Sequence, residues 1–202
     1  MFIKHIIGLF LHPTTEWEEI HNDEGNMLAA MVPALILGLI PAICGYIGTT
    51  QTGWTIGAGD PVWITKDSAA IIAIMYYTII QVAVFSIGWM VHWMAKTYGS
   101  DPSLPACVKL ATYIPTPLFL VGFMQLNPIL WLNMVVGLPA TAYTVFLLYT
   151  GIPTMMDISK DRGFLFSSSV LTVGMIGLVG MLAVTVFLWG IGIEPVLTMN
   201  AP

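Results

Sequence analysis

The sequence predicts an all-α membrane protein, a five-helix transmembrane bundle with a short amphipathic N-terminal interfacial helix. Of its 202 residues, 57% are hydrophobic and 8% are charged, whereas soluble domains carry about 25% charged residues. Five apolar runs each reach the roughly 20 residues that a helix needs to cross a hydrocarbon core of about 30 Å. Lysine and arginine gather in alternate joints between these runs, which is typical of a multi-pass membrane protein.

Residues 2–10 form an apolar run that is too short to cross a membrane. At helical spacing, one face carries Ile3, Ile6, Ile7 and Phe10, and the other carries Lys4, His5, Gly8 and His12. We therefore expect an amphipathic helix that lies in the cytoplasmic interface.

A short acidic helix is predicted to follow. Thr15 and Glu18 have the spacing of a capping box, and Trp17 and Ile20 fall on one side of the helix. Five of the eleven acidic residues lie in one nine-residue stretch that includes His21. Such a stretch either faces solvent and headgroups, which is the interpretation we favour, or holds a divalent cation, although its spacing is not that of an EF-hand loop.

The five spans are predicted at 27–48, 68–95, 104–126, 128–151 and 168–191. This divides the chain into a cytoplasmic interfacial and acidic helical segment at 1–26, a membrane domain at 27–191 and a short outer-face tail at 192–202.

Positive charges set the expected orientation of these spans. The joints on the N-terminal side carry Lys4, Lys96, Lys160 and Arg162, whereas the opposite side carries Lys66. Lysine and arginine collect on the cytoplasmic face, and acidic residues count for little. We therefore expect a cytoplasmic N-terminus and a C-terminus on the outer face.

Lys109 is an unusual residue for the third span. It lies about five residues inside the span, or roughly 7 Å at 1.5 Å per residue, so its stem can snorkel to the interface. In the alternative interpretation Lys109 faces the bundle and pairs with a lipid phosphate or a carboxylate. The same-side joints offer three candidate partners: Asp101, Asp157 and Asp161.

Pro115 and Pro117 follow in the same span. Each proline removes a backbone donor and clashes with the carbonyl one turn back, and in a membrane the freed carbonyls need hydroxyls, neighbouring helices or water. Thr112, Tyr113 and Thr116 supply hydroxyls nearby. The stretch is either a plain kink or a broken helix that lines a polar crevice, with Lys109 and Tyr113 facing the crevice.

Other polar and small residues in the spans have structural interpretations. Gln81 is expected to make an interhelical hydrogen bond, and Gly174, Gly177 and Gly180 are expected to permit close helix contact. His92 is expected to be an interfacial histidine, with a titrating switch as the alternative.

Most catalytic signatures are missing from the sequence. It contains no H-E-x-x-H, C-x-x-C, Walker A or G-x-S-x-G pattern. The predicted spans hold no Asp or Glu, which argues against an intramembrane aspartate dyad and weakens a proton-driven transporter. With six Lys and Arg in total there is no basic patch for nucleic acid. We expect no enzymatic activity, no cofactor and no bound metal.

Four motifs carry a resemblance to a known family. GLFLHPTTEWEEIHNDE, CGYIGTTQTGW, YIPTPLFL and GIPTMMDISKDRGFLFSSSVL resemble, in order and spacing, the bacterial inner-membrane branch of the Yip1-domain family. The resemblance implies a five-span bundle in a bacterial inner membrane, with a cytoplasmic N-terminus and a periplasmic C-terminus. It also implies a scaffold that binds membrane lipids and other membrane proteins, as a homo- or hetero-oligomer, and it brings no catalytic residues.

The leading functional hypothesis is therefore a non-enzymatic inner-membrane scaffold or adaptor. The alternative is a transporter or channel for a small solute or ion that uses the proline-broken third span. A lipid-modifying enzyme ranks last, because only Lys109 and His92 could serve it.

Overall fold

The computed structural model describes residues 2–23, 25–55, 59–192 and 194–198. Within these ranges, five helical stretches are long and apolar enough to cross a membrane. They are Met27–Thr52, Lys66–Tyr98, Leu104–Leu126, Leu130–Met155 and Lys160–Gly190. The all-α, five-helix membrane fold predicted from hydropathy is confirmed.

The first and third spans are built from shorter helices. The first comprises α3 (Met27–Leu37), α4 (Leu39–Ile47) and the π-helical turn η1 (Gly48–Thr52). The third comprises α6 (Leu104–Tyr113), α7 (Thr116–Val121) and the 3-10 turn η3 (Gly122–Leu126). The remaining spans are α5 (Lys66–Ala95) with the 3-10 turn η2 (Lys96–Tyr98), α8 (Leu130–Met155) and α9 (Lys160–Gly190).

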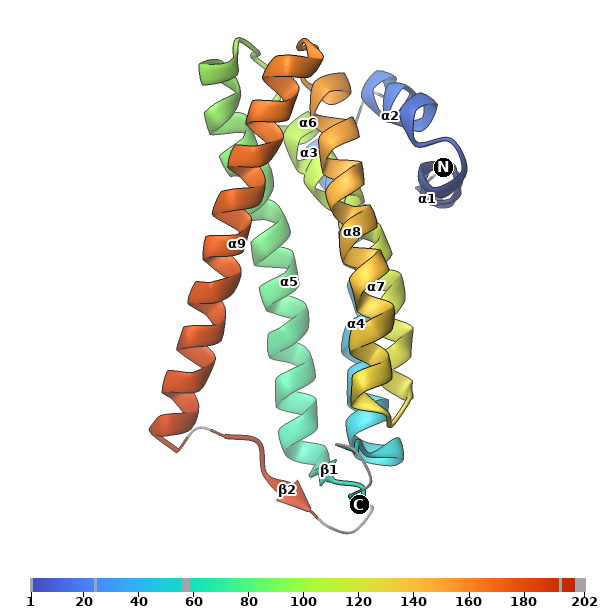
Figure 1. The fold of residues 1–202 in the computed structure, drawn as a ribbon, viewed down its shortest axis with the longest axis vertical. Helices are drawn as coiled ribbons and strands as arrows, with labels where there is room; N and C mark the ends of the chain where they lie inside the picture. The colour runs from blue at the N-terminus through green and yellow to red at the C-terminus, as the bar shows by residue number, and fades with distance from the viewer. Residues whose placement is uncertain (1, 24, 56–58, 193, 199–202) are drawn as a thin grey trace.

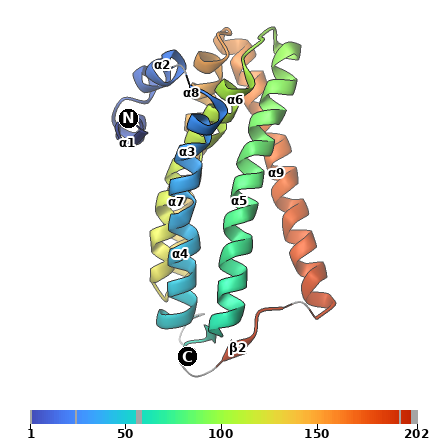
Figure 2. The same ribbon diagram turned by 180° about the vertical axis from the view of Figure 1, so that it is seen from behind.

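The third span lies at the centre of the packing. Helix α6 contacts α3, α5 and α8, while α7 contacts α4 and α8. Helix α9 contacts α5 and α8, and its buried residues all lie between 163 and 170. Figures 1 and 2 show the consequence: α9 meets the bundle at one end and stands apart from it at the other.

Two helices outside the spans cap one end of the bundle, which we call the N-terminal end. They are α1 (Phe2–Leu11) and α2 (Pro13–Asn22), and together we call them the N-terminal platform. In Figure 1, α1 is seen nearly end-on, so it runs across the spans rather than along them. The predicted capping box is wrong. Helix α2 begins at Pro13, a residue suited to a first turn, and its N-cap His12 makes no side-chain cap bond.

Interhelical bonds from α5 support the break in the first span at Gly38. Gln81 donates to the Ala34 carbonyl at 3.1 Å, and Tyr77 donates to the Leu35 carbonyl at 3.1 Å. The interhelical role predicted for Gln81 is therefore confirmed. The Ala34 carbonyl also accepts from the Gly38 amide at 2.9 Å, so the bond from Gln81 adds a second, interhelical contact at this point of the helix.

The fifth span begins eight residues earlier than the sequence predicts, at 160 rather than 168. Its first turn contains Lys160, Asp161 and Arg162, charges that hydropathy assigns to a joint but that suit the membrane surface. The joint before it is correspondingly short. It turns at Asp157, which has a positive φ of 50°, a conformation that aspartate tolerates better than most residues.

The opposite end of the bundle carries a small sheet that hydropathy does not reveal. Strand β1 (Trp63–Ile64) pairs antiparallel with β2 (Leu197–Thr198), in the register Trp63 to Thr198 and Ile64 to Leu197. The described part of the predicted tail is therefore folded back onto the loop before α5, as Figure 1 shows.

Glycines distinguish the packed helices from the unpacked one. At Gly88 in α5, an added Cβ would lie 2.7 Å from the Val108 Cα of α6, so the two backbones are in close contact. At Gly174, Gly177 and Gly180 in α9, an added Cβ would meet nothing within 4 Å. The close helix contact predicted for these three glycines is therefore wrong within this chain, because α9 diverges from α5 before reaching them.

This contrast predicts opposite effects of the same substitution. Gly88→Ala is expected to lower the free energy of unfolding by about 1–3 kcal/mol, because the α6 backbone must move away. Gly177→Ala, the matched control, should have no effect or stabilise the helix by about 0.5–1 kcal/mol. Reversible unfolding in mixed micelles measures both, and equal stabilities would contradict the close approach at Gly88.

Candidate functional site

The site predicted from the sequence begins in α6, the most buried of the spanning helices. The side chain of Ser103 caps its first turn by accepting from the Ala106 amide at 3.3 Å. From Cys107 to Tyr113 every residue is buried. A lysine within such a run has no route to bulk water along its own helix, and its ammonium must find partners inside the protein.

Lys109 finds those partners at the end of α2. The residue is 7% exposed, and its Nζ donates to the carbonyls of Ile20, at 3.4 Å, and Asp23. The Asp23 carboxylate lies 4.0 Å from the same ammonium. The last carbonyls of a helix lack intrahelical partners, and a cation there complements the helix dipole. Lys109 thus caps the C-terminus of α2 from within the bundle.

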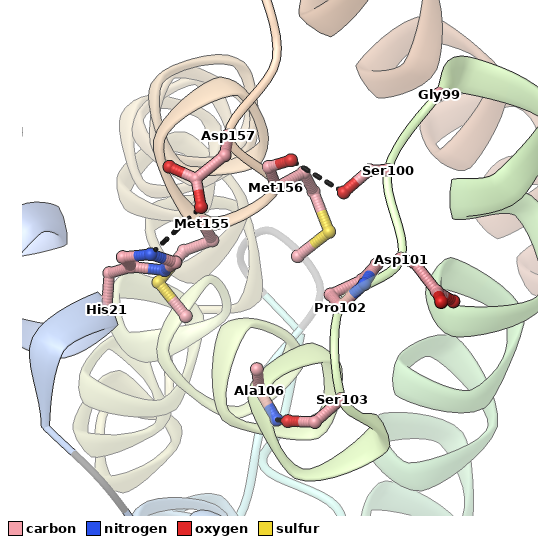
Figure 3. A pocket seen from close by; sticks show the side chains of 10 residues that line it. All are labelled: His21, Gly99, Ser100, Asp101, Pro102, Ser103, Ala106, Met155, Met156 and Asp157. Carbon is pink, nitrogen blue, oxygen red and sulfur yellow. Dashed lines mark hydrogen bonds and ion pairs between the residues drawn. The ribbon is translucent and has the colours of Figure 1, made fainter.

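The expected carboxylate partners of Lys109 lie elsewhere. Asp157 pairs with His21 at 3.2 Å, and Asp101 lies 3.7 Å from the Lys96 ammonium. Both aspartates line a separate pocket of about 430 Å³, shown in Figure 3 with the His21–Asp157 pair dashed. Asp161 lies in the first turn of α9. The carboxylate nearest to the Lys109 ammonium is therefore that of Asp23, and not that of Asp101, Asp157 or Asp161.

Asp23 could have been found from the sequence. It lies just before the first span, at the same end of the bundle as the three candidates, but its place in the acidic stretch favours a solvated position. Lys109 is on the side of α6 that faces α3 and the chain entering it, whereas the joints at 96–103 and 156–159 border the pocket of Figure 3.

The two prolines divide the third span between α6 and α7. Pro117 cannot donate to the carbonyl of Tyr113, four residues back. The Thr116 hydroxyl donates to that carbonyl instead, at 2.6 Å. The Thr112 hydroxyl bonds to the Lys109 carbonyl at 2.8 Å and to the Ala30 carbonyl of α3 at 3.0 Å. Hydroxyls therefore satisfy backbone groups at the break, as the sequence predicts.

Lys109 and Tyr113 also line a cavity of about 310 Å³ beneath α1. His5 of α1 lies on the same wall, with its ring edge-on to that of Tyr113 at 5.9 Å between centroids. Neither Pro115 nor Pro117 lines this cavity. Of the four predicted crevice residues, the structure thus brings together Lys109 and Tyr113 and leaves the prolines to shape the helix.

Three contacts seat the platform on α8. Trp17 is fully buried, its indole donates to the Thr150 hydroxyl at 3.2 Å, and its ring occupies the space left by Gly151. The Tyr143 hydroxyl donates to the Leu9 carbonyl at 2.8 Å. Together with Lys109, these contacts fix both helices of the platform against the bundle.

The outer face of α1 remains apolar and uncovered. Ile3, Ile7 and Leu11 are exposed, whereas His5 and Leu9 are buried beneath the helix. An amphipathic helix that runs across the spans and directs its apolar face outward has the geometry of a helix lying in a membrane interface.

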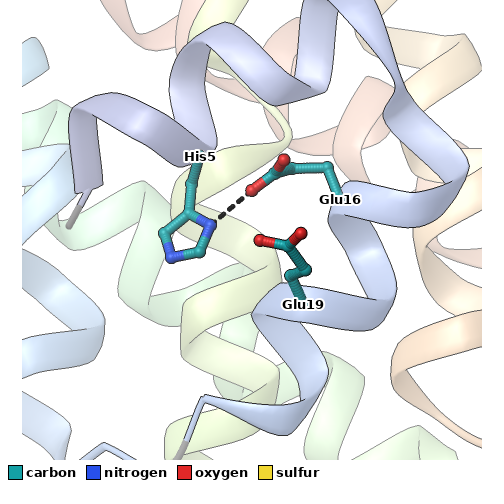
Figure 4. A group of neighbouring side chains, drawn as sticks. All are labelled: His5, Glu16 and Glu19. Carbon is teal, nitrogen blue, oxygen red and sulfur yellow. Dashed lines mark hydrogen bonds and ion pairs between the residues drawn. The ribbon is translucent and has the colours of Figure 1, made fainter.

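A charged cluster joins α1 to α2, as Figure 4 shows. His5 Nδ1 lies 2.5 Å from Glu16 Oε1, with both side chains buried, and the exposed Lys4 ammonium lies 2.6 Å from Glu19 Oε2. The hydrogen bond to Glu19 raises the pKa of Lys4, and the hydrogen bond to Lys4 lowers the pKa of Glu19. Both groups are therefore charged at neutral pH.

His5, Glu16 and Glu19 each offer a ligand atom, and these atoms all lie within 4.8 Å of one another. The cation site that the sequence offers as an alternative for the acidic stretch includes His21, which instead pairs with Asp157. The sequence contains the acidic half of the cluster, but the contribution of His5 depends on the turn between α1 and α2.

The arrangement of spans and platform agrees with a family comparison. The model of the Yip1 domain matches residues 7–181. The chain belongs to the Yip1 domain family. The match begins inside α1 and ends inside α9, so it includes most of the platform as well as the bundle.

Curated relatives support the same conclusion. The chain is 39% identical over 191 residues to inner membrane protein YohC of Escherichia coli strain K12, covering 94% of this chain and 98% of the relative. The YohC protein of Escherichia coli O6:H1 strain CFT073 matches with the same identity and coverage. No solved structure gives a significant match. The chain is thus a multi-pass membrane protein of the Yip1 domain family whose relatives are inner membrane proteins.

The cap on α2 predicts a local effect of Lys109→Met. Hydrogen bonds to charged groups contribute about 1.5–3 kcal/mol, so amide hydrogen exchange in α2 is expected to accelerate about 10- to 100-fold. Exchange in α5 and α8 should change little. Lys96→Met removes an exposed lysine from its pair with Asp101 and serves as the control, because such pairs contribute about 0–1 kcal/mol. Unchanged exchange in α2 would contradict the capping role.

Proposed function

We propose that the protein is a non-enzymatic scaffold or adaptor of an inner membrane, which binds membrane lipids and other membrane proteins. The observation that carries the proposal is the burial of Lys109 beneath the end of α2. Burying a charge at this depth costs free energy, and such charges usually have a function. Here the ammonium holds the N-terminal platform in one position on the bundle. A fixed platform gives a partner a defined surface.

The uncovered face of α1 supports a lipid-facing role for that platform. Helix α1, which carries these exposed isoleucines and leucine, lies beside the N-terminal end of the bundle in Figure 1. Apolar area of this kind favours insertion at the boundary between headgroups and acyl chains. The exposed side of α2, which carries Glu18, is then directed to partners rather than to lipid.

The ionisable side chains at membrane depth do not favour catalysis or transport. Lys109 is bonded to backbone carbonyls, and His92 Nδ1 lies 3.0 Å from the Pro102 carbonyl. At the break in the third span, Thr112 and Thr116 are fully buried and bonded to backbone groups. At this break the hydroxyls and the ammonium are thus occupied by backbone groups, which argues against a transport path through the proline-broken third span.

The charge distribution supports an orientation for the scaffold. We propose that the platform faces the cytoplasm, because Lys4, Lys96, Lys160 and Arg162 lie at its end of the bundle. The small sheet of β1 and β2 then faces the periplasm.

Cysteine labelling tests this orientation. Thr14 and Asp60 are exposed at opposite ends of the bundle, whereas the native cysteines are buried. In intact cells, a membrane-impermeant maleimide is expected to label Asp60→Cys and to label Thr14→Cys only after lysis. The unsubstituted protein is the control for background labelling. The reverse pattern would overturn the proposed orientation.

Native mass spectrometry tests the scaffold itself. Protein extracted under mild conditions into nanodiscs is expected to retain lipid or a protein partner. Lys109→Met should lose this retention, because the platform is released. Lys66→Met is the matched control, since Lys66 is exposed at the start of α5 and at the other end of the bundle. A protein that is always a lone monomer without retained lipid would contradict the proposal.

A further inference from the structure

The cluster between α1 and α2 has a ligand set that the scaffold role does not use. Glu16 and Glu19 are three residues apart in α2, so both project from the same face of the helix. The turn between the helices brings His5 of α1 opposite that face, as Figure 4 shows. We propose that His5, Glu16 and Glu19 form a binding site for a divalent first-row transition ion such as Zn²⁺.

The burial of two of the three groups distinguishes this cluster from ordinary surface carboxylates. Glu16 is 5% exposed and His5 is 6% exposed. Gly8 makes room for the carboxylate, because a Cβ at position 8 would lie 1.7 Å from Glu16 Oε2. The edge-on contact with Tyr113 holds the imidazole ring in its orientation. Such supporting contacts position the ligands of a metal site.

The geometry fits a small ion after a slight adjustment. Two ligand atoms bound to one tetrahedral zinc at about 2.0–2.1 Å lie roughly 3.3 Å apart. In this cluster the His5 and Glu16 atoms are 2.5 Å apart, and all three ligand atoms lie within 4.8 Å of one another. The first separation is shorter than the required value and 4.8 Å is the upper limit for the others, so side-chain rotations that move the His5 and Glu16 atoms apart would admit the ion.

The donor atoms indicate which ions fit. One imidazole nitrogen with two carboxylate oxygens suits zinc and its first-row neighbours. Calcium and magnesium prefer ligand shells made wholly of oxygen. Three protein ligands leave a fourth position open, and Glu16 and Glu19 border a cavity of about 650 Å³ that has room for water there.

A cation already occupies the edge of the cluster. The Lys4 ammonium, whose side chain is 69% exposed, lies against Glu19. Because Lys4 is exposed and flexible, a divalent ion can displace it from Glu19. Lysine and metal therefore compete for the same carboxylate.

This competition predicts opposite changes in Zn²⁺ affinity for two variants. The full-length protein in nanodiscs, stripped by a chelator, is titrated with Zn²⁺ in a calorimeter. We expect one Zn²⁺ per chain, with excess Mg²⁺ having no effect. Glu19→Gln should weaken binding by at least about tenfold, the lower limit of the effect of changing even an outer-shell group. Lys4→Met should tighten it, because the competing ammonium is removed.

Matched variants separate ligation from folding. Glu18→Gln changes an exposed carboxylate on the same helix, outside the cluster, and should bind Zn²⁺ as the unsubstituted protein does. Glu19 is itself exposed, so its substitution leaves the core of the platform intact. The absence of stoichiometric binding, equal effects of Glu18→Gln and Glu19→Gln, or binding weakened by Lys4→Met would each overturn the proposal. The scaffold role is tested separately and does not depend on this result.

Discussion

The buried ammonium of Lys109 is the constraint on which the arrangement of the N-terminal half depends. A lysine between buried neighbours cannot remain unpaired, and the nearest unsatisfied acceptors are the carbonyls at the end of α2. Meeting them holds the end of α2 at Lys109 and places α2 against α8, with Trp17 packed on Gly151. The position of α1, and of the charged cluster beneath it, follows from that of α2. One charge in the third span thus organises a segment that lies outside the five spans.

The third span is suited to this role because it is interrupted. The prolines divide the span into two helices that share α3 and α8 as neighbours but differ in their third, which is α5 for α6 and α4 for α7. The Thr116 hydroxyl bonds to the carbonyl that Pro117 leaves free, and the Thr112 hydroxyl bonds across to α3, so side chains of the span itself support the interruption. The charge and the two prolines are therefore complementary: one attaches the platform, and the others shape the helix that carries the charge.

Much of this fold could be predicted from the sequence, because lipid imposes a simple rule on helix length and polarity. The five spans, the platform helices and the bond from Gln81 all follow from such rules. Contacts between segments that are distant in the sequence do not follow from these rules. Pairing Lys109 with Asp23 requires knowing which side of α6 faces the chain entering α3, and hydropathy carries no such information. The short β1–β2 pairing and the approach of His5 to Glu16 likewise depend on where loops return.

The divergence of α9 from the bundle has a mechanical consequence. A helix of 31 residues is about 46 Å long, well above the hydrocarbon thickness of about 30 Å. Charges in its first turn account for part of the excess by extending into the headgroups, and tilting accommodates the remainder. Because its far half has no helical neighbour among the described residues, little protein contact opposes that tilt. Bilayer thickness is thus the quantity that sets the angle of α9, and a thinner membrane would lay this helix further over.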